Sequence, residues 1–111
     1  MKTYVQIRTR FEGGHCFPGA PPEVQFLSSP HRHEFRVRVK LEVGHDDREI
    51  EFLILKRQVE AIVKYWGFDL GASSCESIAR NLHQQLTTIY GTRSGEIEIS
   101  EDGENSAVLE F

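Results

Sequence analysis

The chain has little cysteine, no excess of positive charge and no long apolar run. Its two cysteines, Cys16 and Cys75, lack the CxxC spacing of metal fingers, which argues against a disulfide scaffold. A net charge of −4 argues against a nucleic-acid or anionic-membrane binder, because such proteins usually carry a basic face. No stretch approaches the roughly 20 apolar residues of a membrane span, and the first residues show no signal-peptide core. We therefore expect a cytoplasmic protein with reduced thiols.

The length of 111 residues predicts a single domain, residues 1–111. Hydrophobic residues make up 39% of the chain, which is enough for one modest core. A domain of this size buries only about two-thirds of the surface of its unfolded chain, so association with copies of itself would add stability. We therefore expect a homo-oligomer.

Apolar and polar residues alternate in the first part of the chain. Residues 3–11 and 35–43 have the period of two that is typical of half-buried strands. Between them, residues 17–30 are rich in Pro, Gly and Ser and predict a loop, which is long for a domain of this size and therefore of functional interest. After a turn at 44–47, residues 48–52 are interpreted as a short returning strand.

Helical spacing follows. Apolar residues recur at three- and four-residue intervals over 55–66 and again over 78–89, which predicts two amphipathic helices. Ser73 and Glu76 have the spacing of a capping box, with Ser73 as the N-cap of the second helix.

Alternation returns at the end of the chain. Residues 96–100 and 107–111 flank a turn and predict a second hairpin. The order of elements is thus β-β-α-α-β-β, which indicates an α+β fold with two helices on one face of an antiparallel sheet. The edges of this sheet would be exposed in a monomer, and pairing between subunits would cover them.

Three histidines are placed to converge. His31 and His33 lie two apart, in phase with the apolar position Phe35, so their side chains share one face of the strand. His15 has the parity of Phe11 on the preceding strand. If the strands pair as a hairpin, the three imidazoles meet at one end of the sheet. Three imidazoles with one open position form the ligand set of a catalytic zinc.

A simpler interpretation of these histidines stays open. An H-x-H pair occurs often by chance, and all three residues could be core or surface histidines that bind no metal. His45 lies among turn acids and His83 in a helix, and both are interpreted as ordinary structural residues.

Five segments, spread in order over nearly the whole chain, are similar to motifs of one protein family. Those at Phe11–Pro18 and Pro30–Phe35 are similar to the F-x-A-A-H and H-G-H-x-[YF] segments of the 6-pyruvoyl-tetrahydropterin and 6-carboxy-tetrahydropterin synthase family. The later segments resemble that family's D-F-x-x-L-K, P-T-S-E-N-x-A and V-x-V-x-E; they are Glu51–Lys56, Ser73–Ala79 and Ile97–Glu101.

This resemblance implies the tunnelling fold, in which hairpin, two helices and hairpin repeat around a trimer-based ring or hexamer. It implies that His15, His31 and His33 hold Zn²⁺, which polarises the side-chain oxygens of the substrate. It also implies that Glu101 anchors a pterin ring through its N–H groups. Family members eliminate triphosphate from dihydroneopterin triphosphate, and the bacterial branch makes 6-carboxy-tetrahydropterin on the way to deazapurines such as queuosine.

The sequence departs from the family at its proton-transfer residues. Leu27 stands where the family has a cysteine, and Leu70 where it has a histidine, with Asp69 in the place of the adjoining acid. Cys16, beside a predicted ligand, and Cys75, in the first turn of a helix whose dipole lowers a thiol's pKa, are the candidate replacements. Each could instead be a small buried hydrophobic residue.

Two acids complete the predicted site. Glu76 is a candidate for substrate binding, or merely half of the capping box, and Glu101 is a ring anchor or a solvated turn acid.

The first hypothesis is a divergent zinc lyase acting on dihydroneopterin triphosphate or a related pterin or purine, with a relocated thiol or activated water as its base. The alternative is a non-catalytic zinc protein of the same fold that binds such a ligand or a protein partner.

Overall fold

The computed structural model describes all 111 residues as an antiparallel sheet with two long helices. No helix is both long and apolar enough to cross a membrane. In chain order the elements are β1 (Thr3–His15), a short 3₁₀ helix η1 (Pro22–Ser28), β2 (His31–Val43), α1 (Phe52–Trp66), α2 (Cys75–Tyr90), β3 (Gly95–Glu101) and β4 (Asn105–Glu110).

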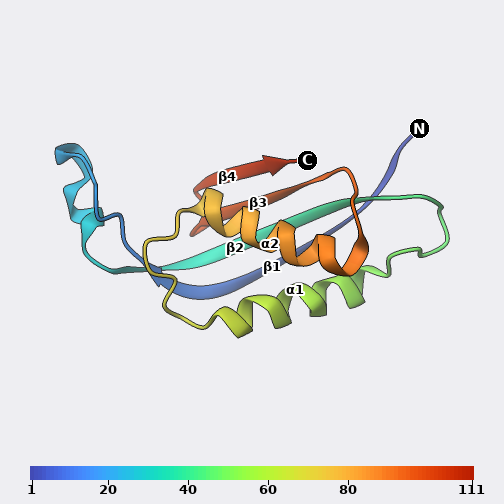
Figure 1. The fold of residues 1–111 in the computed structure, drawn as a ribbon, viewed down its shortest axis with the longest axis horizontal. Coiled ribbons are helices and arrows are strands. Elements are labelled where there is room, and N and C mark those ends of the chain that lie inside the picture. The colour runs from blue at the N-terminus through green and yellow to red at the C-terminus, as the bar shows by residue number, and fades with distance from the viewer.

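The four strands follow one another across the sheet in the order β1-β2-β3-β4, and every neighbouring pair is antiparallel. Helix α1 packs on β1, whereas α2 packs on β3 and β4, so both helices lie along the sheet (Figure 1). The predicted α+β architecture and the β-β-α-α-β-β order are confirmed. The β1–β2 hairpin is the longest part of the sheet, with Thr3 opposite Val43 at one end and His15 opposite His31 at the other.

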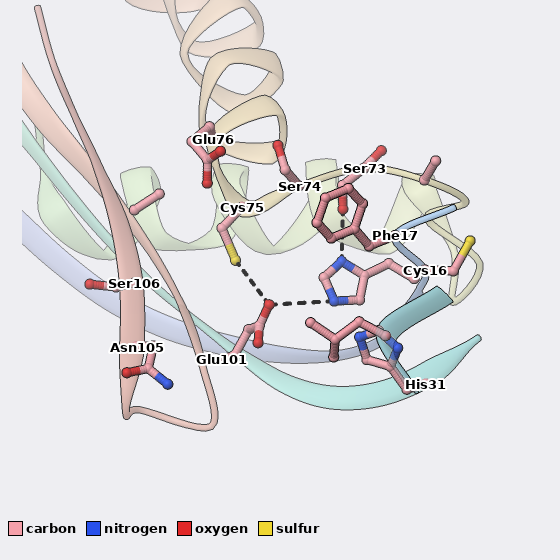
Figure 2. A pocket seen from close by; sticks show the side chains of 14 residues that line it. Cys16, Phe17, His31, Ser73, Ser74, Cys75, Glu76, Glu101, Asn105 and Ser106 are labelled. Atoms are coloured by element: carbon pink, nitrogen blue, oxygen red, sulfur yellow. Dashed lines mark hydrogen bonds and ion pairs between the residues drawn. The ribbon is translucent and has the colours of Figure 1, made fainter. Parts of the chain in front are cut away.

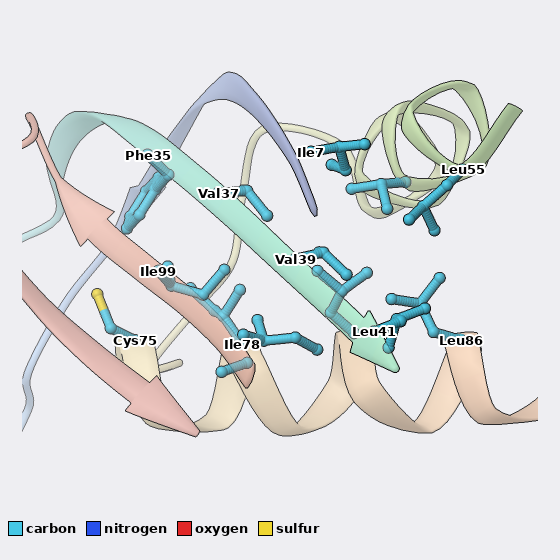
Figure 3. Close-up of a cluster of buried hydrophobic side chains, with 14 of the residues drawn as sticks. Ile7, Phe35, Val37, Val39, Leu41, Leu55, Cys75, Ile78, Leu86 and Ile99 are labelled. Atoms are coloured by element: carbon cyan, nitrogen blue, oxygen red, sulfur yellow. The ribbon is translucent and has the colours of Figure 1, made fainter. Parts of the chain in front are cut away.

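One face of the sheet builds the core because its side chains alternate. The buried residues of β2 point toward the helices, while Arg36 and Arg38 between them point to the other face. Figure 3 shows these side chains meeting the apolar stripes of α1 and α2. The fully buried members with the largest side chains are Phe35, Val37, Val39, Leu55, Val59, Leu82, Leu86, Ile97 and Ile99.

The chain between β2 and α1 differs from the prediction. Residues 48–52 are not a strand, because Arg48 has a positive φ of 57° and Glu51 already caps the next helix. The Glu51 carboxylate accepts a hydrogen bond from the Ile54 backbone N–H at 2.9 Å, so α1 begins at Phe52.

The N-cap of α2 is also one residue later than predicted. The Ser74 hydroxyl accepts the Ser77 N–H at 3.1 Å, which makes Ser74 the cap and leaves Glu76 outside any capping box. Ser73 instead offers its carbonyl oxygen to His15.

The first hairpin is longer than the alternation of residues 3–11 and 35–43 suggested. Both strands continue to the histidines, across Gly13 and Gly14 in β1. The predicted loop at 17–30 contains η1 and is closed at its base by a 2.7 Å hydrogen bond from the Phe17 N–H to the Leu27 carbonyl. The extension of both strands up to the histidines places His15 directly opposite His31.

Candidate metal centre

The three predicted histidines meet at one end of the sheet. One ring nitrogen from each of His15, His31 and His33 lies within 4.8 Å of those of the other two. The ring centroids are 4.6 Å apart for His15 and His31, 5.3 Å for His15 and His33, and 5.0 Å for His31 and His33. His15 is 8% exposed, and the other two are half-buried. The cluster could hold a metal ion.

The outer nitrogen of each ring is held by an acceptor. The contacts are His15 Nδ1 to the Ser73 carbonyl at 2.7 Å, His31 Nδ1 to the Ser29 carbonyl at 2.9 Å, and His33 Nδ1 to the Asp102 carboxylate at 2.7 Å. Carbonyl and carboxylate oxygens only accept, so each Nδ1 is the donor, and a neutral ring then carries its lone pair on Nε2. This is the tautomer and orientation that metal-binding histidines adopt.

Two of the three Nε2 nitrogens lack hydrogen-bond partners. Nε2 of His15 and Nε2 of His33 are both buried and make no hydrogen bond. The Glu101 carboxylate faces them, with Oε1 3.4 Å from His15 Nε2 and Oε2 3.3 Å from His33 Nε2. Lone pairs and a carboxylate that face one another repel unless a cation lies between them. The residues of this centre therefore fit a divalent metal ion.

A cavity of about 520 Å³ opens beside the histidines. This volume is in the range of small-molecule sites. Its wall is formed by the end of β1, the loop before β2, the start of α2 and the β3–β4 hairpin; the lining includes His15, Cys16, Leu27, His31, Cys75, Glu76 and Glu101. The predicted substrate-binding acids Glu76 and Glu101 thus share one cavity, although Glu76 is exposed and only Glu101 reaches the histidines.

The two cysteines are placed differently. Cys75 is buried, and its thiol donates to Glu101 Oε1 at 3.8 Å. Burial, reinforced by the negative charge of Glu101, raises the pKa of Cys75 to about 12, opposite to the lowering predicted from the helix dipole. Cys16 lines the cavity, but its sulfur is directed away from Glu101 (Figure 2), as expected for the strand neighbour of His15.

Of the other predicted positions, Leu27 lines the cavity, whereas Asp69 and Leu70 do not. An apolar side chain therefore occupies the part of the wall that Leu27 forms. Asp69 is exposed, is absent from the cavity lining, and accepts a hydrogen bond from the Gly71 N–H at 2.9 Å. Leu70 packs against the core, and its backbone N–H bonds the Gly14 carbonyl at 2.8 Å. The structure therefore does not bring Asp69 to the histidines.

Asp102 is a site residue that the sequence interpretation missed. Besides accepting from His33, it accepts the Glu34 N–H at 2.9 Å through its other oxygen. The His33 hydrogen bond, followed by that of Glu34, holds the pKa of Asp102 below its ordinary value. Its φ of 57° belongs to the β3–β4 turn, and Asp tolerates this conformation better than most residues. An acid directly after Glu101 was the available signal.

Comparisons with known proteins identify the fold. No protein-family model and no curated protein matches the sequence. The 6-pyruvoyl tetrahydropterin synthase of Caenorhabditis elegans superposes with a TM-score of 0.74 at 14% identity, covering 100% of this chain and 96% of that one. The Plasmodium falciparum 6-pyruvoyl tetrahydropterin synthase gives 0.74 at 16% identity, covering 99% and 98%. The chain therefore has the tetrahydropterin-synthase fold that its motifs implied.

Proposed function

We propose that the chain is a divergent tetrahydropterin synthase-like zinc lyase, acting on dihydroneopterin triphosphate or a related pterin or purine. The observation that carries the proposal is the set of three imidazoles whose Nδ1 atoms are held by acceptors. Two of them, His15 and His33, also have a buried Nε2 without a hydrogen-bond partner. The fold that the chain shares with two 6-pyruvoyl tetrahydropterin synthases supports the same assignment.

In this proposal, His15, His31 and His33 hold Zn²⁺ through Nε2, because imidazole nitrogens suit zinc better than magnesium or calcium. When bound, zinc would act as a Lewis acid toward a side-chain oxygen of the substrate. The chain itself supplies the adjacent cavity and the carboxylates of Glu76 and Glu101. A carboxylate can accept two parallel hydrogen bonds from the guanidine-like edge of a pterin or purine.

The proton acceptor is the least conventional part of the proposal. Of the three candidates, only Cys75 has a side chain that contacts a carboxylate of the centre, whereas Cys16 is directed away from it and Asp69 lies outside the cavity. Burial raises the pKa of Cys75 to about 12, so its thiol keeps its proton and donates a hydrogen bond to Glu101. The proposal therefore takes an activated water as the base.

A second function is favoured by Leu27. An apolar side chain lines the cavity at the position where a proton-transferring cysteine is expected, and a leucine cannot accept a proton. This observation favours a non-catalytic zinc protein that binds a pterin, a purine or a protein partner. Such a protein would gain thermal stability on binding without turnover.

We also infer a cytoplasmic homo-oligomer, a trimer-based ring or a hexamer. Strands β1 and β4 are the open edges of the sheet, and edge pairing between copies would satisfy their backbone groups. Three consecutive exposed apolar residues at the start of α1, Phe52, Leu53 and Ile54, would lose water contact in such an assembly.

Metal content and turnover test the proposal together. Untagged protein is purified, its zinc is counted, and it is incubated with dihydroneopterin triphosphate and related pterins and purines. We expect bound zinc and release of triphosphate in the wild type, and loss of both in the double variant His31→Ala/His33→Ala. The matched control is His45→Ala, an exposed turn histidine distant from the centre in sequence.

Two outcomes would contradict the lyase. A zinc-loaded protein that is stabilised by a pterin or purine but converts none of them would establish the non-catalytic function. A correctly folded wild type that takes up no zinc would leave the histidines as structural residues only.

A further inference from the structure

We infer that the Glu101 carboxylate is the fourth ligand of the metal, so that the centre is closed while no substrate is bound. This inference rests on the proposed metal at His15, His31 and His33. It goes beyond that proposal because the three-histidine set, taken alone, leaves a coordination position open.

Two distances around Glu101, one to each carboxylate oxygen, are those of neighbouring ligands of one zinc ion. With zinc–nitrogen and zinc–oxygen bonds of about 2.0–2.2 Å, two ligand atoms of a tetrahedron lie about 3.3–3.5 Å apart. The two carboxylate oxygens of Glu101 lie 3.4 Å from His15 Nε2 and 3.3 Å from His33 Nε2. Glu101 is therefore already at ligand-to-ligand spacing from two of the histidines.

The orientation of these contacts argues against a simple ion pair. If His15 and His33 were protonated on Nε2 to pair with Glu101, each N–H would point at a carboxylate oxygen. Neither Nε2 makes a hydrogen bond to Glu101 despite the short distance. Ligand atoms that point toward a shared cation have this relation, because each lone pair is directed at the cation and not at the other ligand.

The surrounding chain holds Glu101 in this place. Glu101 is the last residue of β3, paired with Phe35 of β2 on one side and Asn105 of β4 on the other. The thiol of Cys75 donates to its Oε1. The following residue, Asp102, holds the ring of His33. One turn of the chain thus supplies both a ligand and the partner that orients another ligand.

The experiment measures zinc affinity and access of a small anion to the metal. Zinc affinity is determined by competition with a chromophoric chelator for the wild type, Glu101→Gln, Glu101→Ala and the control Glu76→Gln. Glu76 lines the same cavity but contacts none of the histidines. Azide is then titrated into the Co²⁺-loaded proteins while the visible spectrum is followed.

We expect both Glu101 variants to bind zinc at least about tenfold more weakly than the wild type, since even outer-sphere partners of a metal are worth about 10–100-fold. Glu76→Gln should bind as the wild type does. Azide should change the cobalt spectrum of Glu101→Ala and leave that of the wild type unchanged, because only the variant has a free position. Melting curves of the metal-free proteins verify that each variant is folded.

Three results would overturn the inference. Unchanged zinc affinity in a folded Glu101→Gln and Glu101→Ala would show that Glu101 is not a ligand. A spectral response of the wild type to azide would show that the centre is open, while the proposed lyase would stand. A wild type that binds neither zinc nor cobalt would remove the metal centre and the proposed function as well.

Discussion

The β1–β2 hairpin carries a polar cluster at each end, and the two clusters differ in how their charged and titratable groups are paired. At the end away from the histidines, Arg93 donates to the Tyr90 carbonyl at 2.9 Å, to the Glu42 carbonyl at 3.0 Å and to the Glu49 carboxylate at 2.9 Å. The second oxygen of Glu49 accepts the Gly44 N–H. Within this cluster, the guanidinium and the carboxylate satisfy each other and the backbone around them.

The histidine end is built from the same kinds of group but is not satisfied. The buried Nε2 atoms of His15 and His33 have no hydrogen-bond partner, although a carboxylate lies beside them. Native proteins pair nearly all of their buried polar atoms. The Arg93 guanidinium and the Glu49 carboxylate are both paired, and the one unsatisfied buried atom beside them is the neutral hydroxyl of Tyr90. At the histidine end, two neighbouring imidazole nitrogens are unsatisfied beside a carboxylate, which is the arrangement that a bound cation would complete.

The largest effect is expected from removing Arg93 from its cluster. Arg93→Ala leaves the carbonyls of Tyr90 and Glu42 and the carboxylate of Glu49 without their donor, so we expect the free energy of unfolding to fall by about 2 kcal/mol. Urea unfolding of the metal-free protein measures this change. Zinc retention by the folded variant should stay at the wild-type level.

The control for this change is Arg57→Ala, which removes an exposed arginine of α1 and should alter stability by less than about 0.5 kcal/mol. If Arg93→Ala also lost its zinc while still folded, the two ends of the hairpin would be coupled and the comparison between them would fail.

Local patterns were sufficient to predict most of the fold. Alternation and helical spacing each extend over many residues in the two hairpins and two helices, and all of these elements are present. The prediction failed where the pattern was short. Five residues at 48–52 were too few to distinguish a strand from the turn and helix cap that form there, and the α2 cap depended on which of Ser73 and Ser74 was engaged by His15.

The site was predictable only in so far as it depends on strand parity. Parity placed the three histidines on one face, and the hairpin brings them together. The role of Asp102 depends on how β2 pairs with β3, a contact between distant parts of the chain that no local pattern encodes. The pKa of Cys75 was predicted in the wrong direction, because burial of the thiol outweighs the helix dipole.

A smaller effect is expected from replacing Asp102, the acceptor that orients His33. Asp102→Asn retains a residue that tolerates the positive φ but replaces one of two acceptor oxygens with a donor, so His33 and the Glu34 N–H cannot both be served. We expect zinc affinity to fall about tenfold, with little change in metal-free stability. Chelator competition measures it, and Glu104→Gln in the same turn is the control. Equal affinities in Asp102→Asn and wild type would show that His33 is oriented without Asp102.

The smallest expected effect is a change in folding stability at low pH. It concerns the Glu49 carboxylate in the Arg93 cluster. The hydrogen bond from Arg93, followed by that from the Gly44 N–H, lowers the pKa of Glu49 from 4.5 to about 2. A lowered pKa means that the folded state favours the charged form, so the stabilisation is complete above pH 4.5 and disappears as the pH falls toward 2. In metal-free protein, the stability difference between wild type and Glu49→Gln should therefore be greatest near neutral pH and shrink across this interval. Urea midpoints at a series of pH values measure it, with Glu23→Gln, an exposed acid of η1, as the control. A difference that stays constant down to pH 2 would mean that Glu49 acts by its shape and not by its charge.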